Sequence, residues 1–256
     1  MKVPPKANLS ASPVVELRQY TLKPGKRETL IDLFDDKLIK GQEEAGMTII
    51  GQFRDLDRPN MFVWLRGFDS MEARKNALTC FYDGPVWAAH RDAANGTMID
   101  SDDVLLLKPA WPGSCFKLSG LQRPAGRRLG KASEGNRLAG SVAIQIHHLR
   151  PGTEIDFGSR FKTEAVSLLE WLGAHVLGAF VTEHAENSFP RLPVRAGENI
   201  FIAVTGFVSA EAHSGHEAAL TALPEWQAFA QAAQPNLAKP TEFLRLSPTS
   251  RSLLGR

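Results

Sequence analysis

The chain has 256 residues, of which 43% are hydrophobic and 23% charged, a composition that is typical of a globular protein with room for two domains. Its formal net charge of +2 offers no strong field to recruit nucleic acid or an anionic membrane, and no run approaches the roughly 20 apolar residues of a membrane span. With two cysteines and no secretory signal in residues 1–12, we expect a cytoplasmic protein without nucleic-acid or membrane partners.

The chain repeats itself at two offsets. Residues 22–25 (LKPG) match residues 149–152 (LRPG) at an offset of 127 (149 − 22), and residues 67–68 (GF) match residues 206–207 at an offset of 139 (206 − 67). Further matched pairs are Phe34 and Phe161, Gly51 and Gly178, Phe53 and Phe180, Trp87 and Trp226, and Pro109 and Pro248. The larger second offset places one insertion between Phe180 and Asn199, which we predict to be a long surface loop.

Each copy shows the same order of predicted elements. In the first copy, strands are predicted at residues 14–22, 48–53, 61–68 and 104–107. Helices are predicted from Lys26 onward, from an N-cap at Ser70 through Leu78, and from Pro85 onward. This β-α-β-β-α-β order indicates a ferredoxin-like α+β unit with one bare sheet face. Two such units are expected to bury their bare faces against each other, as an intramolecular dimeric α+β barrel.

These patterns divide the chain into a first unit at residues 13–109, a linker at 110–140 and a second, diverged unit at 141–248. The linker is rich in glycine and carries one acidic residue, Glu134. Its basic residues are Lys117, Arg123, Arg127, Arg128, Lys131 and Arg137. The composition favours a solvated linker, and a basic loop that folds over a pocket is the alternative.

Four segments of the first unit have a distinctive sequence. They are residues 16–25 (ELRQYTLKPG), 62–68 (FVWLRGF), 84–95 (GPVWAAHRDAAN) and 98–107 (MIDSDDVLLL). Together they resemble the NIPSNAP family of the dimeric α+β barrel superfamily. The resemblance implies a ferredoxin-like fold with barrel pairing, but no defined reaction. The wider superfamily includes cofactor-free oxygenases, small isomerases and haem enzymes, so any activity carried over from it would be an analogy at the level of the fold.

Strand alternation sorts the side chains of the first unit into two faces. Because helices need an apolar floor, we expect them to cover Val15, Leu17, Val63 and Leu65. The opposite, barrel-facing set is then Glu16, Arg18, Tyr20, Trp64 and Arg66. Charges inside a barrel are costly unless they are paired or hydrated. Two interpretations stay open: an ion-pair network of Glu16 with Arg18 or Arg66 that joins the two halves, or a pocket whose guanidinium groups clamp a small anionic ligand.

The second unit lacks most of these polar residues, since Gln145 replaces Arg18, Thr205 replaces Arg66 and Phe229 replaces His90. We therefore predict a ligand site in the first unit. The predicted ligand-binding residues are Glu16, Arg18, Trp64, Arg66, Tyr82, Arg91 and, from the second unit, His147. The predicted catalytic residues are Tyr20 and His90, with His90 as a general acid or base. The alternative for His90 is a structural histidine bonded to Asp100, Asp102 or Tyr82.

The histidines lack metal-ligand spacing, and no phosphate-binding loop or nucleophile motif is present, so we predict no metal and no cofactor. The leading hypothesis is a protein that binds a small molecule, acting as a cofactor-independent oxygenase or isomerase if it is an enzyme. One alternative is an interaction module whose exposed helices or 181–198 loop bind another protein. Another is a haem protein with His147 as the iron ligand. The pseudo-dimeric chain is also a candidate to pair again as a homodimer.

Overall fold

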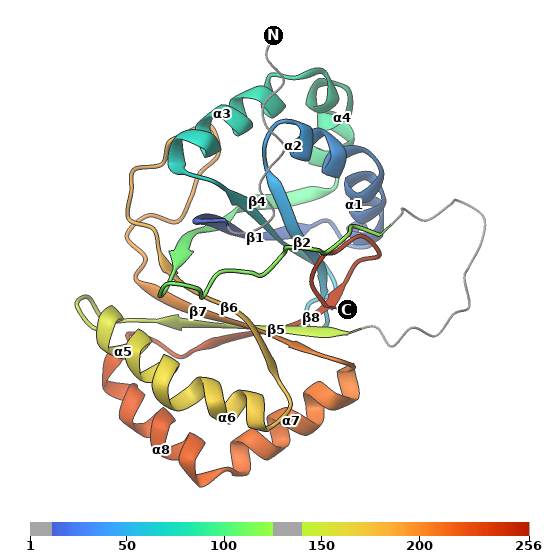
Figure 1. Cartoon of the computed structure of the whole chain (residues 1–256). Helices are drawn as coiled ribbons and strands as arrows, with labels where there is room; N and C mark the ends of the chain where they lie inside the picture. Colours follow the sequence, from blue (N-terminus) through green and yellow to red (C-terminus); the bar gives the residue numbers. More distant parts are fainter. Residues whose placement is uncertain (1–11, 125–139, 256) are drawn as a thin grey trace.

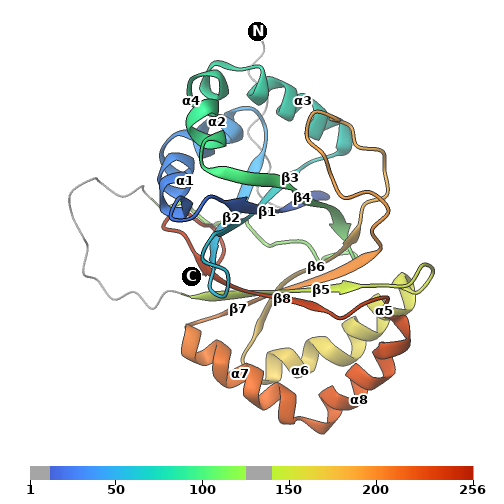
Figure 2. The same ribbon diagram turned by 180° about the vertical axis from the view of Figure 1, so that it is seen from behind.

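The computed structural model describes residues 12–124 and 140–255, whose strands close into a barrel between two layers of helices (Figures 1 and 2). The order of the described strands around the barrel is β1-β3-β2-β8-β5-β7-β6-β4, and each pair of neighbours is antiparallel. Helices α1 to α4 cover one side of the barrel and helices α5 to α8 cover the other. The predicted fold, two ferredoxin-like units paired within one chain, is confirmed.

The strands are β1 (Val14–Leu22), β2 (Thr48–Asp55), β3 (Met61–Phe68), β4 (Met98–Pro109), β5 (Ser141–His148), β6 (His175–Thr182), β7 (Ile200–Phe207) and β8 (Glu242–Pro248). The helices of the first unit are α1 (Arg27–Leu33), the π-helical turn η1 (Phe34–Leu38), α2 (Ile39–Glu44), α3 (Met71–Tyr82) and α4 (Pro85–Asn95). Those of the second unit are α5 (Glu154–Arg160), the π-helical turn η2 (Phe161–Ala165), α6 (Val166–Trp171), α7 (Ala210–Ala222), α8 (Pro224–Ala233) and the 3-10 turn η3 (Gln234–Asn236).

The element bounds repeat at the two offsets found in the sequence. The first residues of β2 and β6 are related by the smaller offset (175 − 48 = 127), and those of β3 and β7 by the larger one (200 − 61 = 139). The π-helical turns η1 and η2 also start at the smaller offset (161 − 34 = 127), so the duplication preserves even an irregular turn. Strand β4 is longer than predicted, because it pairs with β1 as far as Met98, past two shifts in register.

The two faces of the sheet are reversed relative to our prediction. Val15, Leu17, Val63 and Leu65 lie in the barrel interior with aliphatic residues of the second unit, such as Ile144. Tyr20 and Trp64 instead pack under the helices of the first unit, and Glu16, Arg18 and Arg66 share that face by strand alternation. The physical reason is space, because the interior of an eight-stranded barrel is just wide enough for packed side chains. Here aliphatic residues fill it together with Phe53, Phe116 and Phe180. The larger aromatic and charged side chains fit in the layer between sheet and helices.

The two units pair with each other along two short stretches of strand, which close the shared barrel. Residues 53–55 of β2 pair with residues 246–248 of β8, and residues 107–109 of β4 pair with residues 180–182 of β6. The chain then leaves β4 and β8 in the same way. The amide of Ala110 donates to the carbonyl of Ala179, and the amide of Thr249 donates to that of Gln52, at matching offsets (249 − 110 = 139; 179 − 52 = 127).

The segments that follow, residues 110–124 and 249–255, complete the barrel core. Phe116, Leu118 and Leu254 are buried in the same cluster as the aliphatic barrel residues. This part of the predicted linker is therefore packed rather than solvated. Arg127, Arg128, Lys131 and Arg137 of that linker lie outside the described residues.

The inserted loop, residues 183–199, folds back onto the first unit, beside α3 (Figures 1 and 2). Phe189 is 6% exposed and stacks on Tyr82 of α3 with ring centroids 6.0 Å apart. Arg191 forms an ion pair of 2.6 Å with Asp83. The segment is a long surface loop, as predicted, and Phe189 is its buried residue. It is also anchored to the first unit, because this aromatic side chain removes apolar surface of both units from water.

We expect Gly51→Ala to lower the free energy of unfolding by about 1–3 kcal/mol, because an added methyl group would overlap the ring of Phe53, which is fully buried. Gly178 and Phe180 repeat this arrangement in the second unit. Urea denaturation would measure the change. Gly215→Ala on α7 is the matched control: its added methyl group meets nothing within 4 Å, so it should be neutral or stabilising. Equal effects of the two substitutions would contradict the packing argument.

Candidate functional site

Glu16 of β1 lies at the centre of a buried ion cluster with Arg18, Arg66 and Arg74, called the Glu16 cluster below. Its Oε2 atom accepts hydrogen bonds from Nη1 of Arg18 and Nε of Arg66, both at 2.7 Å, and its Oε1 atom accepts one from Nε of Arg74 at 2.6 Å. The four side chains are at most 1% exposed. The predicted pairs of Glu16 with Arg18 and with Arg66 are therefore both present, together with a third arginine.

Local structure explains how the cluster assembles. Glu16 lies opposite Arg66 in the register of β1 with β3, so both side chains emerge on the same face of the sheet. Arg74 comes from the first turn of α3, whose N-cap Ser70 accepts a hydrogen bond from the amide of Ala73. Arg74 was missing from our prediction. Its equivalent in the second unit is His213 (213 − 74 = 139), so it follows the same pattern of replacement as Arg18 and Arg66.

The cluster carries more positive than negative charge. Among the described residues, three arginines pair with one carboxylate here, which gives a net charge of +2 (3 − 1). The Nη2 atoms of Arg66 and Arg74 are buried and have no hydrogen-bond partner in the described part of the chain. Two buried NH2 groups of this kind are costly unless an acceptor reaches them. The arrangement therefore has the charge and the free donors to hold an anion.

The pKa shifts agree with this charge balance. Burial alone would raise the pKa of Glu16, but the charges of Arg66, Arg18 and Arg74 outweigh it and hold that pKa far below its ordinary value. Burial lowers the pKa of Arg74, Glu16 opposes this shift, and Arg66 and Arg18 add to it. Glu16 is thus ionised at every physiological pH. The positive charge of Arg74 lies close to the positive charges of Arg66 and Arg18.

A cavity of about 30 Å³, the aromatic cavity, adjoins the cluster beneath the helices of the first unit. Its lining residues include Tyr20, Phe34, Gln42, Trp64, Phe81, Tyr82 and Trp87. The guanidinium carbons of Arg18 and Arg66 lie 5.5 and 5.1 Å from the ring centre of Trp64, so the cluster forms one edge of this site. The volume is about that of one water molecule.

Tyr20 connects the cavity to the cluster. Its hydroxyl oxygen accepts a hydrogen bond of 3.0 Å from Nε of Arg18. Burial raises the pKa of Tyr20, so the phenol keeps its proton at neutral pH and can donate it to an acceptor in the cavity. Helix α4 covers this region loosely: Ala94 is its buried residue, and Val86 and Trp87 are only partly buried. Such a weakly buried helix can open locally at low cost.

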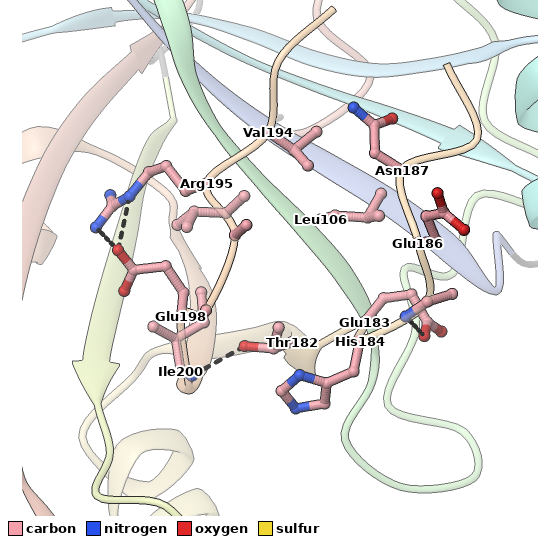
Figure 3. Close-up of a pocket in the computed structure, with 14 residues that line it drawn as sticks. Leu106, Thr182, Glu183, His184, Glu186, Asn187, Val194, Arg195, Glu198 and Ile200 are labelled. Carbon is pink, nitrogen blue, oxygen red and sulfur yellow. Dashed lines mark hydrogen bonds and ion pairs between the residues drawn. The ribbon is translucent and has the colours of Figure 1, made fainter. Parts of the chain in front are cut away.

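A second hollow of about 270 Å³, the loop pocket, lies between the inserted loop and β4 (Figure 3). Both arms of the loop are fixed to β4, since the amides of Glu183 and Arg195 donate to the carbonyls of Leu106 and Val104, each at 2.9 Å. Asn187 lines this pocket and accepts a hydrogen bond of 2.9 Å from Nη1 of Arg74. The loop of the second unit therefore completes the surroundings of a cluster that belongs to the first.

The loop pocket has an acidic lining. Glu183 and Glu186 lie on one arm, and Glu198 lies on the other beside Arg195 (Figure 3). Arg195 is engaged by Glu198 at 2.5 Å and by Asp103 at 3.1 Å. Carboxylates therefore dominate the potential of this pocket, which disfavours anions.

The structure brings together some of the predicted site residues and separates others. Tyr20, Trp64 and Tyr82 line the aromatic cavity, and Glu16, Arg18 and Arg66 form the adjoining cluster. His90 is half-buried on α4, where it lowers the pKa of Asp36 more weakly than Lys37 does. Arg91 is exposed and lies 3.5 Å from Asp92. Neither His90 nor Arg91 lines a cavity described above.

His147 lies in the second unit, under the helices and not in the barrel interior as we expected. Its ring packs against Phe157, Phe161 and Phe201, with ring centroids 4.9 to 6.1 Å away, and its Nδ1 atom is hydrogen-bonded to the hydroxyl of Thr241 at 3.0 Å. Burial, with a smaller effect of His148, lowers the pKa of His147 to about 3. The neighbouring phenylalanines occupy the space that a haem would need, so these residues do not fit that cofactor.

Among residues 12–124 and 140–255, no helix is both long enough and apolar enough to cross a membrane. Comparisons with known proteins give a family match for the first unit. The family model that matches is NIPSNAP, over residues 15–111. No curated protein matches the chain.

Two solved structures share the fold over nearly the whole length of this chain. A proposed monooxygenase from Lactobacillus acidophilus has a TM-score of 0.56 and 13% identity, with 93% of this chain and 94% of that chain covered. A proposed monooxygenase from Fusobacterium nucleatum has a TM-score of 0.58 and 8% identity, with 96% of each chain covered. An uncharacterised NIPSNAP-like domain protein from Burkholderia xenovorans is 24% identical with a TM-score of 0.36, and the match covers 44% of this chain and 88% of that one.

Proposed function

We propose, from the site itself, that the first unit binds a small organic anion between its sheet and its helices. Residues 15–111 of this unit match the NIPSNAP family model, and that family name specifies no reaction. The observation that carries the proposal is the net charge of +2 in the Glu16 cluster, with two buried Nη2 groups that lack an acceptor among the described residues. A carboxylate or enolate oxygen would satisfy both the charge and the donors.

The apolar part of the ligand would occupy the aromatic cavity, enlarged by displacement of α4. We place the entry beneath α4 because Tyr82, Val86 and Trp87 are only partly buried there. The loop pocket is the less suitable route, since Glu183, Glu186 and Glu198 would repel an approaching anion. His90 and Arg91 on the outer part of α4 would contact a ligand only while it enters.

Calorimetric titration with phenylacetate, salicylate and hexanoate, each paired with its neutral amide, tests this proposal. We expect at least one carboxylate to bind and its amide not to bind. Arg74→Gln should weaken binding about tenfold or more, because it removes a charged donor. His213→Gln, at the equivalent position of the second unit, should leave binding unchanged.

Circular dichroism and thermal melts would establish that both variants are folded. If Arg74→Gln binds each carboxylate as tightly as the wild type, or if the amides bind equally well, the excess of arginine has no role in ligand binding. The ion-pair interpretation of the cluster would then stand, since Arg74 also joins the two halves through Asn187 and Ser188 of the loop.

A cofactor-independent oxygenase is the second candidate, favoured by the protonated Tyr20 beside Arg18. Such chemistry starts from an anionic substrate that passes an electron to dioxygen, and a positively charged cavity stabilises that anion. Oxygen consumption with 1,4-dihydroxynaphthalene should exceed the rate of autoxidation and should fall in Tyr20→Phe. A rate equal to autoxidation would leave a binding protein as the function.

The two other predicted functions have less support. A haem site at His147 is not proposed, because phenylalanines fill its surroundings. An interaction module that uses the 181–198 loop could present the exposed residues of that loop, such as Glu186 and Arg191, while Phe189 stays in the core of the first unit. Contacts through the exposed helices and pairing as a homodimer stay predictions.

A further inference from the structure

A third cavity, the seam cavity, has a volume of about 440 Å³ and lies in the second unit. It is bounded by α6, β6 and the segments 110–124 and 249–255, which both lie outside the repeated β-α-β-β-α-β elements. Trp111, Val166, Leu177 and Leu254 give it apolar walls, and Glu170 supplies a carboxylate. Its size falls within the range of about 300–1,000 Å³ that small-molecule sites occupy.

The equivalent place in the first unit, between α2 and β2, is filled by one side chain. Glu43 there corresponds to Glu170 (170 − 43 = 127), and Ile49 corresponds to Val176 (176 − 49 = 127). The guanidinium group of Arg123 pairs with Glu43 at 2.5 Å and donates to the carbonyl of Arg251 at 2.6 Å and to the carbonyl of Ile49. Its side chain is 10% exposed, so the first unit buries an organic cation in this position.

The second unit keeps the surroundings without that cation. Glu170 and Val176 both line the seam cavity, as do Gly113 and Ser114, which correspond to Ser252 and Leu253 of the tail (252 − 113 = 139; 253 − 114 = 139). No arginine lines the seam cavity among the described residues, and its one lining cation there, Lys117, is exposed. A guanidinium-sized space with a carboxylate at its edge is thus open in one unit and occupied in the other.

The ring of Trp111 forms part of the apolar wall and already contacts two neighbours. It stacks on Phe201 with centroids 6.3 Å apart, and Nζ of Lys162 lies 5.9 Å from its centre. The group of this cavity that would recognise a guanidinium or amidinium ion is therefore the carboxylate of Glu170, since carboxylates pair with such ions through charge-assisted hydrogen bonds.

We propose that the seam cavity binds a small organic cation, an amidinium or guanidinium group on an apolar body, with Glu170 as its counter-ion. The cation would take the place that Arg123 takes in the first unit, and its body would contact Leu177, Leu254 and Trp111. This site lies in the other unit from the anion site proposed above, has the opposite charge preference, and does not depend on it.

Benzamidine is the probe, and the two cysteines of the chain provide the readout. Cys115 lines the seam cavity, whereas Cys80 is exposed on α3 of the first unit. We expect saturating benzamidine to slow the alkylation of Cys115 by N-ethylmaleimide several-fold and to leave Cys80 unchanged, as measured by peptide mass spectrometry on the full chain. Neutral benzamide should protect neither cysteine.

Glu170→Gln should weaken the binding of benzamidine about fivefold or more in calorimetric titration, and should remove the protection of Cys115. Glu164→Gln is the matched control, because Glu164 lies earlier on the same helical segment and pairs with Arg160 at the surface. Three results would each overturn the proposal: no protection of Cys115, equal protection by benzamide, or equal affinity of Glu170→Gln and Glu164→Gln. Because Glu170 is exposed and outside the core, neither substitution should impair folding.

Discussion

Glu16→Gln is expected to lower the free energy of unfolding at pH 7 by about 3–5 kcal/mol, the usual cost of removing one partner from a buried ion pair. Glutamine keeps the volume of glutamate, so no cavity forms. It leaves Arg18, Arg66 and Arg74 without a counter-ion at no more than 1% exposure, and their mutual repulsion is then unopposed. Urea denaturation followed by far-UV circular dichroism would measure the loss.

The control for this experiment is Glu164→Gln, whose pair with Arg160 is 30% to 45% exposed and should contribute less than about 0.5 kcal/mol. Acid provides a second test. The folded-state pKa of Glu16 lies far below its ordinary value of 4.5, so its contribution is complete above that pH and is lost as the pH falls below it. The gap between wild type and Glu16→Gln should therefore narrow below about pH 4.5. If Glu16→Gln lowers the free energy of unfolding by less than about 1 kcal/mol at pH 7, water or a bound anion must compensate the charges of the arginines.

His147→Phe is expected to reduce the acid sensitivity of the fold in a different window. The pKa of His147 is lowered from 6.5 to about 3 in the folded chain, chiefly by burial. Between these two values the unfolded chain binds a proton that the folded chain excludes, so stability falls as the pH falls from 6.5 toward 3. At pH 5 the loss is about 2 kcal/mol, because each unit of pKa difference corresponds to about 1.4 kcal/mol.

Phenylalanine can pack against Phe157, Phe161 and Phe201 and has no proton to bind, so the variant should lose about 2 kcal/mol less than the wild type between pH 7 and pH 5. Denaturation midpoints at the two pH values would measure this difference. His184, which is exposed in the loop, offers a control substitution to glutamine. Identical pH dependence of wild type and His147→Phe would place the acid sensitivity elsewhere. The loss of stability caused by protonation of Glu16 begins near pH 4.5, about two pH units below the onset for His147 near pH 6.5, so the two groups can be distinguished.

The repeat was the part of the fold that the sequence predicted best. Glycine, proline and aromatic residues such as Gly51 and Phe53 match across the two units because a close backbone approach leaves no alternative at those positions. The orientation of the sheet was predicted wrongly, although a signal was present. Val15 and Leu17 correspond to Val142 and Ile144, aliphatic in both units, whereas the other face differs between the units. The matching face is the one that both units bury in the shared barrel.

The candidate site was only partly predictable. The pairs of Glu16 with Arg18 and Arg66 follow from strand alternation and register, which act over a few residues. The position of the Arg74 side chain depends on where α3 crosses the sheet, and that of Asn187 depends on the path of the inserted loop. Neither is set by local periodicity. Similarly, we predicted His90 to lie beside the arginines because the equivalent residue, Phe229, is apolar. Helix α4 is less deeply buried than α8, however, and His90 is only half-buried.

The uneven repeat has a consequence for binding curves. A barrel made of two identical chains would carry the Glu16 cluster twice, and its two copies could influence each other. Here the second unit replaces Glu16 with Ala143 and Arg66 with Thr205, so the described chain holds one cluster per barrel. Saturation by the proposed anion should therefore be hyperbolic, with one ligand per 28.1 kDa chain and a Hill coefficient of about 1. To the anion site the second unit contributes the inserted loop, through Asn187 and Ser188, and no ion cluster of its own among the described residues.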